Sequence, residues 1–235
     1  MSRERKKARP VRRFLRISAA LVAAFLLLSA ALVLPFRWIA PPTSAFMLQD
    51  QSGRIPILYE WAGWSSLGTN AALAVVAAED QKFAEHFGFD LSSIRKSVDR
   101  YNAGDSLRGA STITQQVAKN LYLWPGRSFL RKGIEAWLTL LIELFWSKER
   151  ILEIYLNIAE LGPGLYGMPA ASRVYFGKAP DVLSEAEAAL LAAVLPNPHR
   201  LNAARPSAYV RERQRWIERQ MQRLQREAWI LRISQ

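Results

Sequence analysis

Two adjacent acidic residues, Glu79 and Asp80, close an apolar, alanine-rich segment of the chain. The segment predicts a helix over residues 70–86. Because adjacent helical residues point about 100° apart, the two carboxylates face different directions, with Phe83 and His86 on the Glu79 side. Aromatic surroundings raise the pKa of a carboxyl group, which suits acid–base catalysis near neutral pH. The competing interpretation is a solvated acid pair on an ordinary helix.

A polar segment over residues 109–120 carries hydroxyl and amide side chains behind a glycine. Thr112 and Gln115 have the spacing of a capping box, which predicts a helix that begins there and runs to about residue 121. Backbone N–H groups at a helix start attract anions, and Lys119 follows one turn after Gln115. The competing interpretation is an ordinary capped helix that binds nothing.

Basic side chains gather after this segment, with Lys119, Arg127, Arg131 and Lys132 falling within fourteen residues. Arginine and lysine side chains bind phosphate oxygens, so the cluster indicates a ligand that bears phosphate. Glu135 follows Arg131 by four residues, and a surface ion pair within one helix would explain these two equally well.

Helices have to position these residues, because helical spacing and capping signals recur through the rest of the chain. Residues 44–68 predict irregular or short extended structure, and residues 162–167 predict a loop. The acid Glu143 is expected on a helix surface. No long stretch alternates apolar and polar residues as a strand would, so the fold class is mainly α. Further helices are predicted over residues 91–103, 129–146, 148–161, 169–175, 185–195 and 207–232.

An uncharged, apolar run of twenty residues, 17–36, follows a strongly basic N-terminal segment, residues 1–16. About twenty apolar residues span the hydrocarbon core of a bilayer. Flanking basic residues place the N-terminal side in the cytoplasm and the rest of the chain outside it. A cleaved signal peptide is the alternative, but its apolar core is typically about 7–15 residues, shorter than this run. We therefore predict a cytoplasmic tail, a transmembrane anchor and an extracytoplasmic remainder.

The formal net charge of +12 is concentrated at the two ends of the 235-residue chain. Residues 1–16 carry +7 and residues 200–235 carry +6, whereas the stretch between them is nearly neutral. A nucleic-acid-binding domain spreads basic residues over a folded face, so we expect no nucleic-acid partner. The chain has no cysteine and only two histidines, which excludes disulfides and thiol nucleophiles and argues against a multi-histidine metal site.

The C-terminal segment, residues 201–235, predicts a basic amphipathic helix. Its apolar residues recur every seven positions, at Val210, Ile217, Leu224 and Leu231. The arginines lie mainly off this stripe. They either rest near anionic headgroups or lipid-linked phosphates, or they form the solvated face of a helix packed on the domain.

Taken in order, these segments resemble the motif series of the bacterial peptidoglycan glycosyltransferases, glycosyltransferase family 51. The main motifs are E-D-x-x-F-x-x-H-x-G at 79–88, G-x-S-T-I-T-Q-Q-x-x-K-N at 109–120, R-K-x-x-E at 131–135 and K-x-x-I-L-E-x-Y-L-N at 148–157. The runs G-x-G-x-x-G at 162–167 and A-A-S-x-x-Y-F-G-K at 170–178 fit the same family. Each motif alone is modest, but the ordered series is specific, and it covers about residues 42–200. With one anchor and no transpeptidase motif, the chain is similar to the monofunctional members.

The resemblance implies a lysozyme-like, mainly α catalytic domain with a small membrane-proximal lobe. It also implies polymerisation of lipid II into β-1,4-linked glycan strands, with inversion at the donor carbon and release of undecaprenyl diphosphate. Glu79 matches the family's catalytic acid, which acts as general base on the acceptor 4-hydroxyl. Glu135 matches the second acid, which supports the donor site.

The same resemblance assigns binding residues around the donor diphosphate. Basic positions that hold it are matched by Lys119, Arg127, Arg131 and Lys132, and its polar wall by Ser111, Thr112, Gln115, Gln116 and Asn120. The family often allows a divalent metal, Mg²⁺ or Mn²⁺, and uses no organic cofactor, although no sequence feature here fixes a metal ligand. The implied partners are lipid II, the growing glycan chain, the membrane, and proteins of cell-wall synthesis or division. The implied location is the bacterial inner membrane, with a single span and a periplasmic catalytic domain.

Two other functions fit parts of the sequence. A lytic muramidase would share a catalytic glutamate and a glycan groove, but finished glycan has no diphosphate for the basic cluster at 119–132 to bind. A non-enzymatic anchored scaffold would need neither acid. The transferase is the function that accounts for the acids and the cations together.

Overall fold

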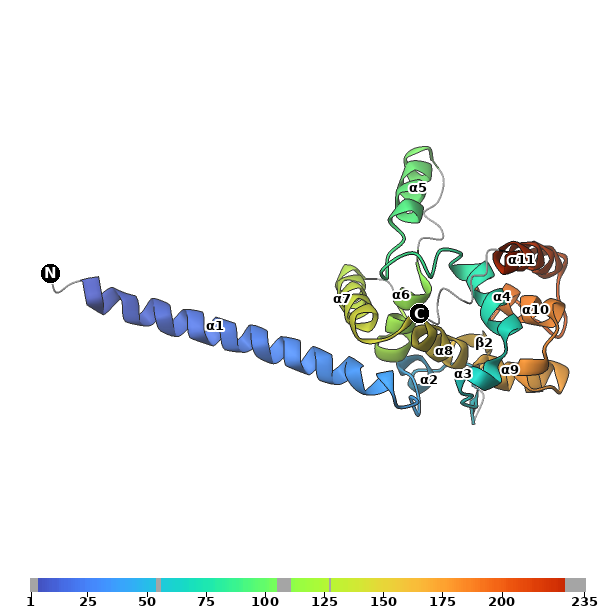
Figure 1. Ribbon diagram of the computed structural model, residues 1–235, viewed down its shortest axis with the longest axis horizontal. Coiled ribbons are helices and arrows are strands. Elements are labelled where there is room, and N and C mark those ends of the chain that lie inside the picture. Colours follow the sequence, from blue (N-terminus) through green and yellow to red (C-terminus); the bar gives the residue numbers. More distant parts are fainter. Residues whose placement is uncertain (1–3, 54–55, 105–110, 127, 227–235) are drawn as a thin grey trace.

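The apolar N-terminal run forms a long helix, α1 (Glu4–Val33), that projects from the body of the molecule (Figure 1). This computed structural model describes residues 4–53, 56–104, 111–126 and 128–226. Residues 12–37 are long and apolar enough to cross a membrane, and they are exposed almost throughout. A core helix of a soluble protein would be mostly buried, so its exposure favours a membrane span.

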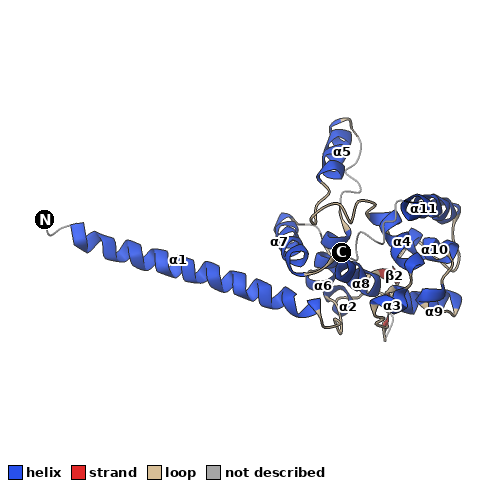
Figure 2. Ribbon diagram, viewed as in Figure 1, coloured by secondary structure: helices blue, strands red, loops and turns tan. Residues whose placement is uncertain are grey.

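Helices make up most of the rest, and the few strands lie at the base of the domain (Figure 2). The mainly α prediction is confirmed. In chain order the elements after α1 are η1 (Leu34–Arg37), α2 (Ala45–Leu48), β1 (Leu58–Tyr59), α3 (Trp64–Leu67), α4 (Thr69–Glu79), α5 (Leu91–Asn102), α6 (Ile113–Tyr122), α7 (Phe129–Phe145), α8 (Lys148–Ile158), β2 (Glu160–Gly162), β3 (Leu165–Tyr166), α9 (Met168–Phe176), η2 (Pro180–Val182), α10 (Glu185–Val194) and α11 (Ala208–Arg226).

The core is centred on α4, which is apolar on every side and buried from Ala71 to Ala77. Helices α8, α10 and α11 pack around it. A helix that is hydrophobic all round needs this complete cover, because no polar face is left for solvent. The last turn of α4, which ends at Glu79, is thereby held rigidly by three neighbouring helices.

The helix predicted to run to residue 86 ends instead at Glu79, so this prediction is wrong. Asp80 has an extended backbone (φ −160°), and its carboxylate accepts from the backbone N–H of Ile113 at 3.0 Å. The same carboxylate lies 2.9 Å from Nε2 of His86. Asp80 thus serves the start of α6 instead of continuing α4, and the expected sharing of one helical face by Phe83, His86 and Glu79 does not occur.

A small three-stranded sheet, ordered β1-β3-β2, closes the base of the domain. Strand β1 pairs in parallel with β3, and β2 pairs antiparallel with β3 as a tight hairpin. The prediction that residues 162–167 are loop throughout is therefore wrong for its strand residues. Strands of two or three residues bury too few side chains for an alternating pattern to show in the sequence.

The C-terminal end of α1 and the following η1 are attached to the domain by hydrogen bonds from Trp137, Trp146 and Arg150. Trp146 Nε1 donates to the Val33 carbonyl at 3.1 Å, and Arg150 donates to the Phe36 carbonyl at 2.8 Å. Trp137, in the middle of α7, donates from Nε1 to Ser29 Oγ of α1 at 3.2 Å. The domain is therefore fixed against the last turns of α1.

Gly167, at the start of α9, is a position where the backbone requires glycine. Its φ is +84°, and an added Cβ would overlap the Asn157 carbonyl oxygen. We expect Gly167→Ala to lower the free energy of unfolding by about 3 kcal/mol or more, from backbone strain and overlap together. Gly177→Ala is the matched control: its φ is +66° but nothing lies within 4 Å of the new methyl. Its expected cost is about 1 kcal/mol. Equal losses in thermal unfolding would contradict this assignment.

Candidate active site

Glu79 lies at the C-terminal end of α4, where side chains from two other helices contact it and a side chain from a third orients one of these two. Gln116 Nε2 of α6 donates to Glu79 Oε2 at 3.0 Å. Arg213 of α11 donates to Glu79 Oε1 at 3.2 Å. Tyr155 of α8 donates to the amide oxygen of Gln116 at 2.9 Å and so fixes which end of that amide faces the carboxylate. The Glu79 side chain is 15% exposed, which leaves it accessible from one side.

The environment raises the pKa of Glu79 above its ordinary value of 4.5. Burial is the main cause, since a charged carboxylate loses hydration there, and the neighbouring Asp80 charge acts in the same direction. The Gln116 hydrogen bond and the charges of Arg213 and Lys119 oppose this rise. A carboxylate that is ionised but more basic than usual is suited to general-base catalysis.

The second predicted acid, Glu135 of α7, is 2% exposed and holds two cations. Arg131 donates from Nη1 to Glu135 Oε2 at 2.8 Å, and Lys132 Nζ contacts Oε1. The Arg131 side chain is only 10% exposed. The i,i+4 ion pair of the alternative interpretation is therefore present, but it is buried and not on the surface, and the Glu135 carboxylate orients both cations.

Lys119 of α6 connects the two acids. Its Nζ lies 5.2 Å from the ring centre of Phe46, and burial lowers its pKa. Its charge interacts with both acids and with both neighbouring cations, Glu79, Glu135, Arg131 and Lys132. Lys119 is partly buried, so its ammonium group is less hydrated than one at the surface, which strengthens its attraction for an anion.

Two buried polar atoms beside this cluster have no hydrogen-bond partner among the described residues. They are Oδ1 of Asn120 and Nε of Arg131. Buried polar groups in folded proteins are almost always paired, so an unpaired donor and acceptor together favour a site that receives a polar ligand.

The remaining predicted site residues form no hydrogen bond or ion pair with the side chains of Glu79 or Glu135 in the part of the chain that the structure describes. Thr112 and Gln115 are 3% and 4% exposed and form the predicted capping box, and Thr112 Oγ1 also donates to the Gly88 carbonyl at 2.7 Å. Asp80 occupies the Ile113 N–H, so part of the expected anion site at this helix start is filled from within the chain. Ser111 is exposed. Arg127 lies outside the described residues.

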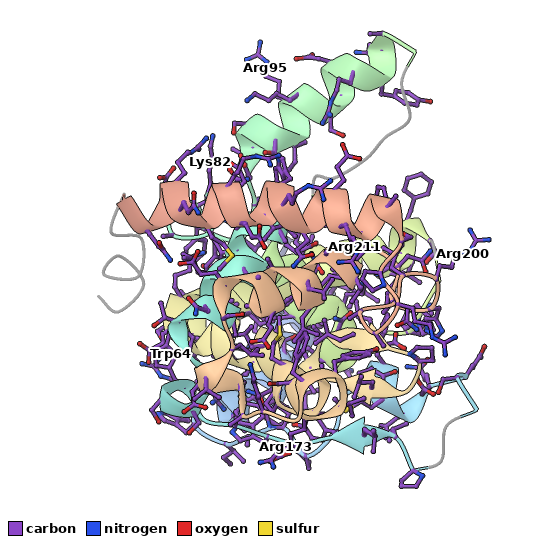
Figure 3. All side chains as sticks on the ribbon, turned by 90° about the vertical axis from the view of Figure 1, so that its right-hand side faces the viewer. Trp64, Lys82, Arg95, Arg173, Arg200 and Arg211 are labelled. Carbon is purple, nitrogen blue, oxygen red and sulfur yellow. The ribbon has the colours of Figure 1, made fainter. Side chains whose placement is uncertain are left out.

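A cleft of about 430 Å³ opens beside Glu79. Its walls come from the end of α4, the following loop, α5, the start of α6 and α11, with Glu79, Lys82, Ser93, Ser111, Trp216 and Arg223 among its lining residues. Figure 3 shows α5 standing above α11, with Lys82 between them. The cleft gives a ligand access to Glu79 from the side away from the buried core.

Sequence reasoning missed several residues that hold this site. Glu143 was expected on a helix surface, but it is 8% exposed, accepts from Thr114 Oγ1 at 2.5 Å and pairs with Lys148 at 2.7 Å. This expectation is wrong because α6 covers that side of α7. Arg213 was also missed; only its place beside the apolar stripe of the C-terminal helix indicated that it faces the domain.

That stripe is buried: Val210 and Ile217 are 0% exposed and Leu224 is 2% exposed, while Leu231 lies outside the described residues. Helix α11 packs on α4 and α10 as part of the core. Figure 1 places it at the end of the domain opposite α1. This burial supports the interpretation of a helix packed on the domain with a solvated basic face. It does not support contact of the arginines with lipid headgroups.

The donor set does not suit a metal held by the protein alone. Within the described residues no group of three or more His, Asp and Glu side chains gathers around a point. The Asp80 carboxylate already contacts His86 and the Ile113 N–H, and the Glu135 carboxylate is already paired with Arg131 and Lys132.

Comparison with known proteins agrees with this geometry. The family profile described as Transglycosylase matches residues 57–222, which includes most of α11. The chain is 51% identical over 207 residues to a biosynthetic peptidoglycan transglycosylase of Pseudomonas putida (strain W619), covering 86% of this chain and 88% of that protein. It is 54% identical over 179 residues to the corresponding protein of Chromohalobacter salexigens, covering 76% of each. The corresponding protein of Pseudomonas aeruginosa is 49% identical over 204 residues, covering 84% of this chain and 88% of that protein. The chain therefore belongs to the transglycosylase family.

Proposed function

We propose that this protein is a peptidoglycan glycosyltransferase that joins lipid II units into β-1,4-linked glycan strands. The observation that carries the proposal is the pairing of an accessible, unusually basic carboxylate, Glu79, with a neighbouring cation cluster that is partly buried and held by the buried acid Glu135. The cluster consists of Lys119, Arg131 and Lys132. The relatives at about 50% identity bear the name of this activity.

In the proposed reaction Glu79 takes the proton from the 4-hydroxyl of the acceptor sugar. The resulting oxygen nucleophile attacks the anomeric carbon of the growing chain from the side opposite its diphosphate. The bond from that carbon to the diphosphate oxygen breaks, and undecaprenyl diphosphate leaves with the bonding electrons. A single displacement inverts the α-linked donor to a β-linked product, so no covalent glycosyl-enzyme is needed.

The leaving diphosphate gains negative charge as its bond to the sugar breaks. Lys119, Arg131 and Lys132 are placed to stabilise that charge, because ammonium and guanidinium groups bind phosphate oxygens strongly when poorly hydrated. Glu135 keeps Arg131 and Lys132 in position and offsets the positive charge that develops on the donor sugar. The unpaired amide oxygen of Asn120 is an acceptor, so in this proposal it receives a hydrogen bond from a sugar hydroxyl of the donor and not from the diphosphate. The donor site keeps five further predicted contributors, which are Arg127, Ser111, Thr112, Gln115 and Gln116.

The test is an assay of the purified, detergent-solubilised full chain with lipid II. We expect polymeric glycan that muramidase digestion breaks down, with one undecaprenyl diphosphate released per bond formed. Release of soluble fragments from finished cell wall, without polymer from lipid II, would instead identify a lytic muramidase. No turnover of either substrate would favour an anchored scaffold.

We further propose that α1 is an uncleaved anchor with its basic end in the cytoplasm. The hydrogen bonds from Trp137 and Trp146 to α1 support retention, because cleavage would leave both indole N–H groups without these partners. Since the natural chain has no cysteine, single cysteines report the orientation cleanly. We expect a membrane-impermeant maleimide to label Ser65→Cys, an exposed position on α3, in intact spheroplasts, and to label Ser2→Cys only after lysis. The opposite pattern would contradict the orientation.

A divalent cation, Mg²⁺ or Mn²⁺, stays a prediction of the family resemblance. The described residues do not form a site that would hold it, so no step above depends on it. Partner proteins of cell-wall synthesis or division likewise stay predictions.

A further inference from the structure

Arg213 approaches Glu79 from the side opposite Gln116. One guanidinium nitrogen lies 3.2 Å from Glu79 Oε1 and 3.4 Å from the carbonyl oxygen of Ala78. Gln116 donates to the other carboxylate oxygen. Each oxygen of Glu79 therefore has one donor, which fixes the plane of the carboxylate and leaves its remaining lone pairs for a ligand in the cleft.

The helix that carries Arg213 is rigidly attached. Val210, Ile217 and Met221 are completely buried on the underside of α11, and Gln214 Nε2 donates to the Ala186 carbonyl of α10 at 2.8 Å. Nε of Arg213 is buried without a partner among the described residues, an unfavourable arrangement for a charged donor. The ion pair with Glu79 offsets that cost, so this arginine is not an ordinary surface residue of a basic helix.

We propose that Arg213 is a positioning residue of the transfer reaction, holding the Glu79 carboxylate ionised and oriented so that it can accept the proton of the acceptor hydroxyl. This proposal rests on the function proposed above. It gives one arginine of the C-terminal helix a role in the chemistry, in place of a role in binding lipid headgroups.

The charges around Glu79 explain why a second cation is needed. Lys119 of α6 and Arg213 of α11 face the carboxylate as cations, Asp80 adjoins it as an anion, and the Tyr155 phenol of α8 stays neutral because burial raises its pKa far above 10. When the donor diphosphate binds, its negative charge offsets that of Lys119. Arg213 is then the cation that still favours the charged form of Glu79.

The test compares the pH dependence of kcat/KM for the wild type, Arg213→Gln and Arg213→Lys. Removing the cation raises the pKa of Glu79, so the acid limb for Arg213→Gln should move up by about 1 pH unit or more. Its rate should approach that of the wild type at high pH. Arg213→Lys keeps the charge, so its acid limb should stay near the wild-type position. Arg219→Gln, on the exposed side of the same helix, is the matched control and should leave the profile unchanged.

A second measurement does not depend on turnover. Titration of the Glu79 carboxyl carbon by ¹³C NMR, assigned with the Glu79→Gln variant, should show a higher midpoint in Arg213→Gln than in the wild type. An unchanged midpoint overturns the inference whether or not the chain polymerises lipid II. So does an equal loss of rate at every pH together with a lower melting temperature, because that pattern reports only a structural role. Failure of wild-type polymerisation with a shifted midpoint would overturn the proposed function alone.

Discussion

The Glu79→Gln variant is expected to polymerise lipid II about 10²- to 10⁴-fold more slowly than the wild type, the range associated with loss of a general base. Glutamine has nearly the same shape, and the amide can keep one of the two contacts that the carboxylate makes with Gln116 and Arg213. It cannot take a proton from the acceptor hydroxyl. The loss should appear in kcat, with thermal stability little changed.

Glu60→Gln is the matched control for this variant. Glu60 is also a carboxylate paired with an arginine, Arg173, but its side chain is 45% exposed. Neither residue lines the cleft beside Glu79. The same chemical change there should leave the rate unaltered. A Glu79→Gln enzyme with wild-type kcat would show that another group removes the proton, and the mechanism proposed here would be wrong.

Lys119→Gln is expected to lower kcat/KM by about 10²- to 10³-fold, the scale seen when one preorganised electrostatic contact to a developing charge is removed. The charge of Lys119 interacts with both Glu79 and Glu135, and in the proposed mechanism it stabilises the leaving diphosphate. Because the diphosphate gains charge in the transition state, most of the loss should fall on kcat.

Lys178→Gln is the control, since Lys178 is paired with a surface carboxylate, Glu187, and its side chain is 45% exposed. Steady-state kinetics with lipid II at several concentrations separates kcat from KM. A Lys119→Gln enzyme with a higher KM and an unchanged kcat would mean that the lysine binds ground state and transition state equally. Its proposed role in stabilising the leaving group would then be wrong.

Local features of the fold followed well from the sequence. The capping boxes at Thr112 and Ser184 are present, and the helices they open begin at the next residue. A capping box depends on two residues that are three positions apart, so the local sequence is enough to predict it. The apolar run of α1 is equally local, because its composition and length decide that it can cross a bilayer.

The end of α4 shows where local reasoning fails. The residues after Glu79 could continue the helix. Asp80 instead accepts a hydrogen bond from the backbone N–H of Ile113, thirty-three residues away, which a continued helix would not allow. A backbone N–H at the start of α6 needs an acceptor, and Asp80 supplies it. The side chain of Glu79 is then free to point into the cleft instead of along a helix surface.

By itself the sequence determined the mainly α class, an apolar helix long enough to cross a membrane, and the ordered motifs that contain the two acids and their basic neighbours. These depend on residues close together in the chain. Only the tertiary structure decided which groups face Glu79, because Gln116 and Arg213 reach it from two different helices and Tyr155, on a third helix, holds the Gln116 amide. Arg213 is 134 residues away, and its contact exists because the buried stripe of α11 packs against α4. Burial and charge at a site depend on such packing, and so the raised basicity of Glu79 is a property of the fold.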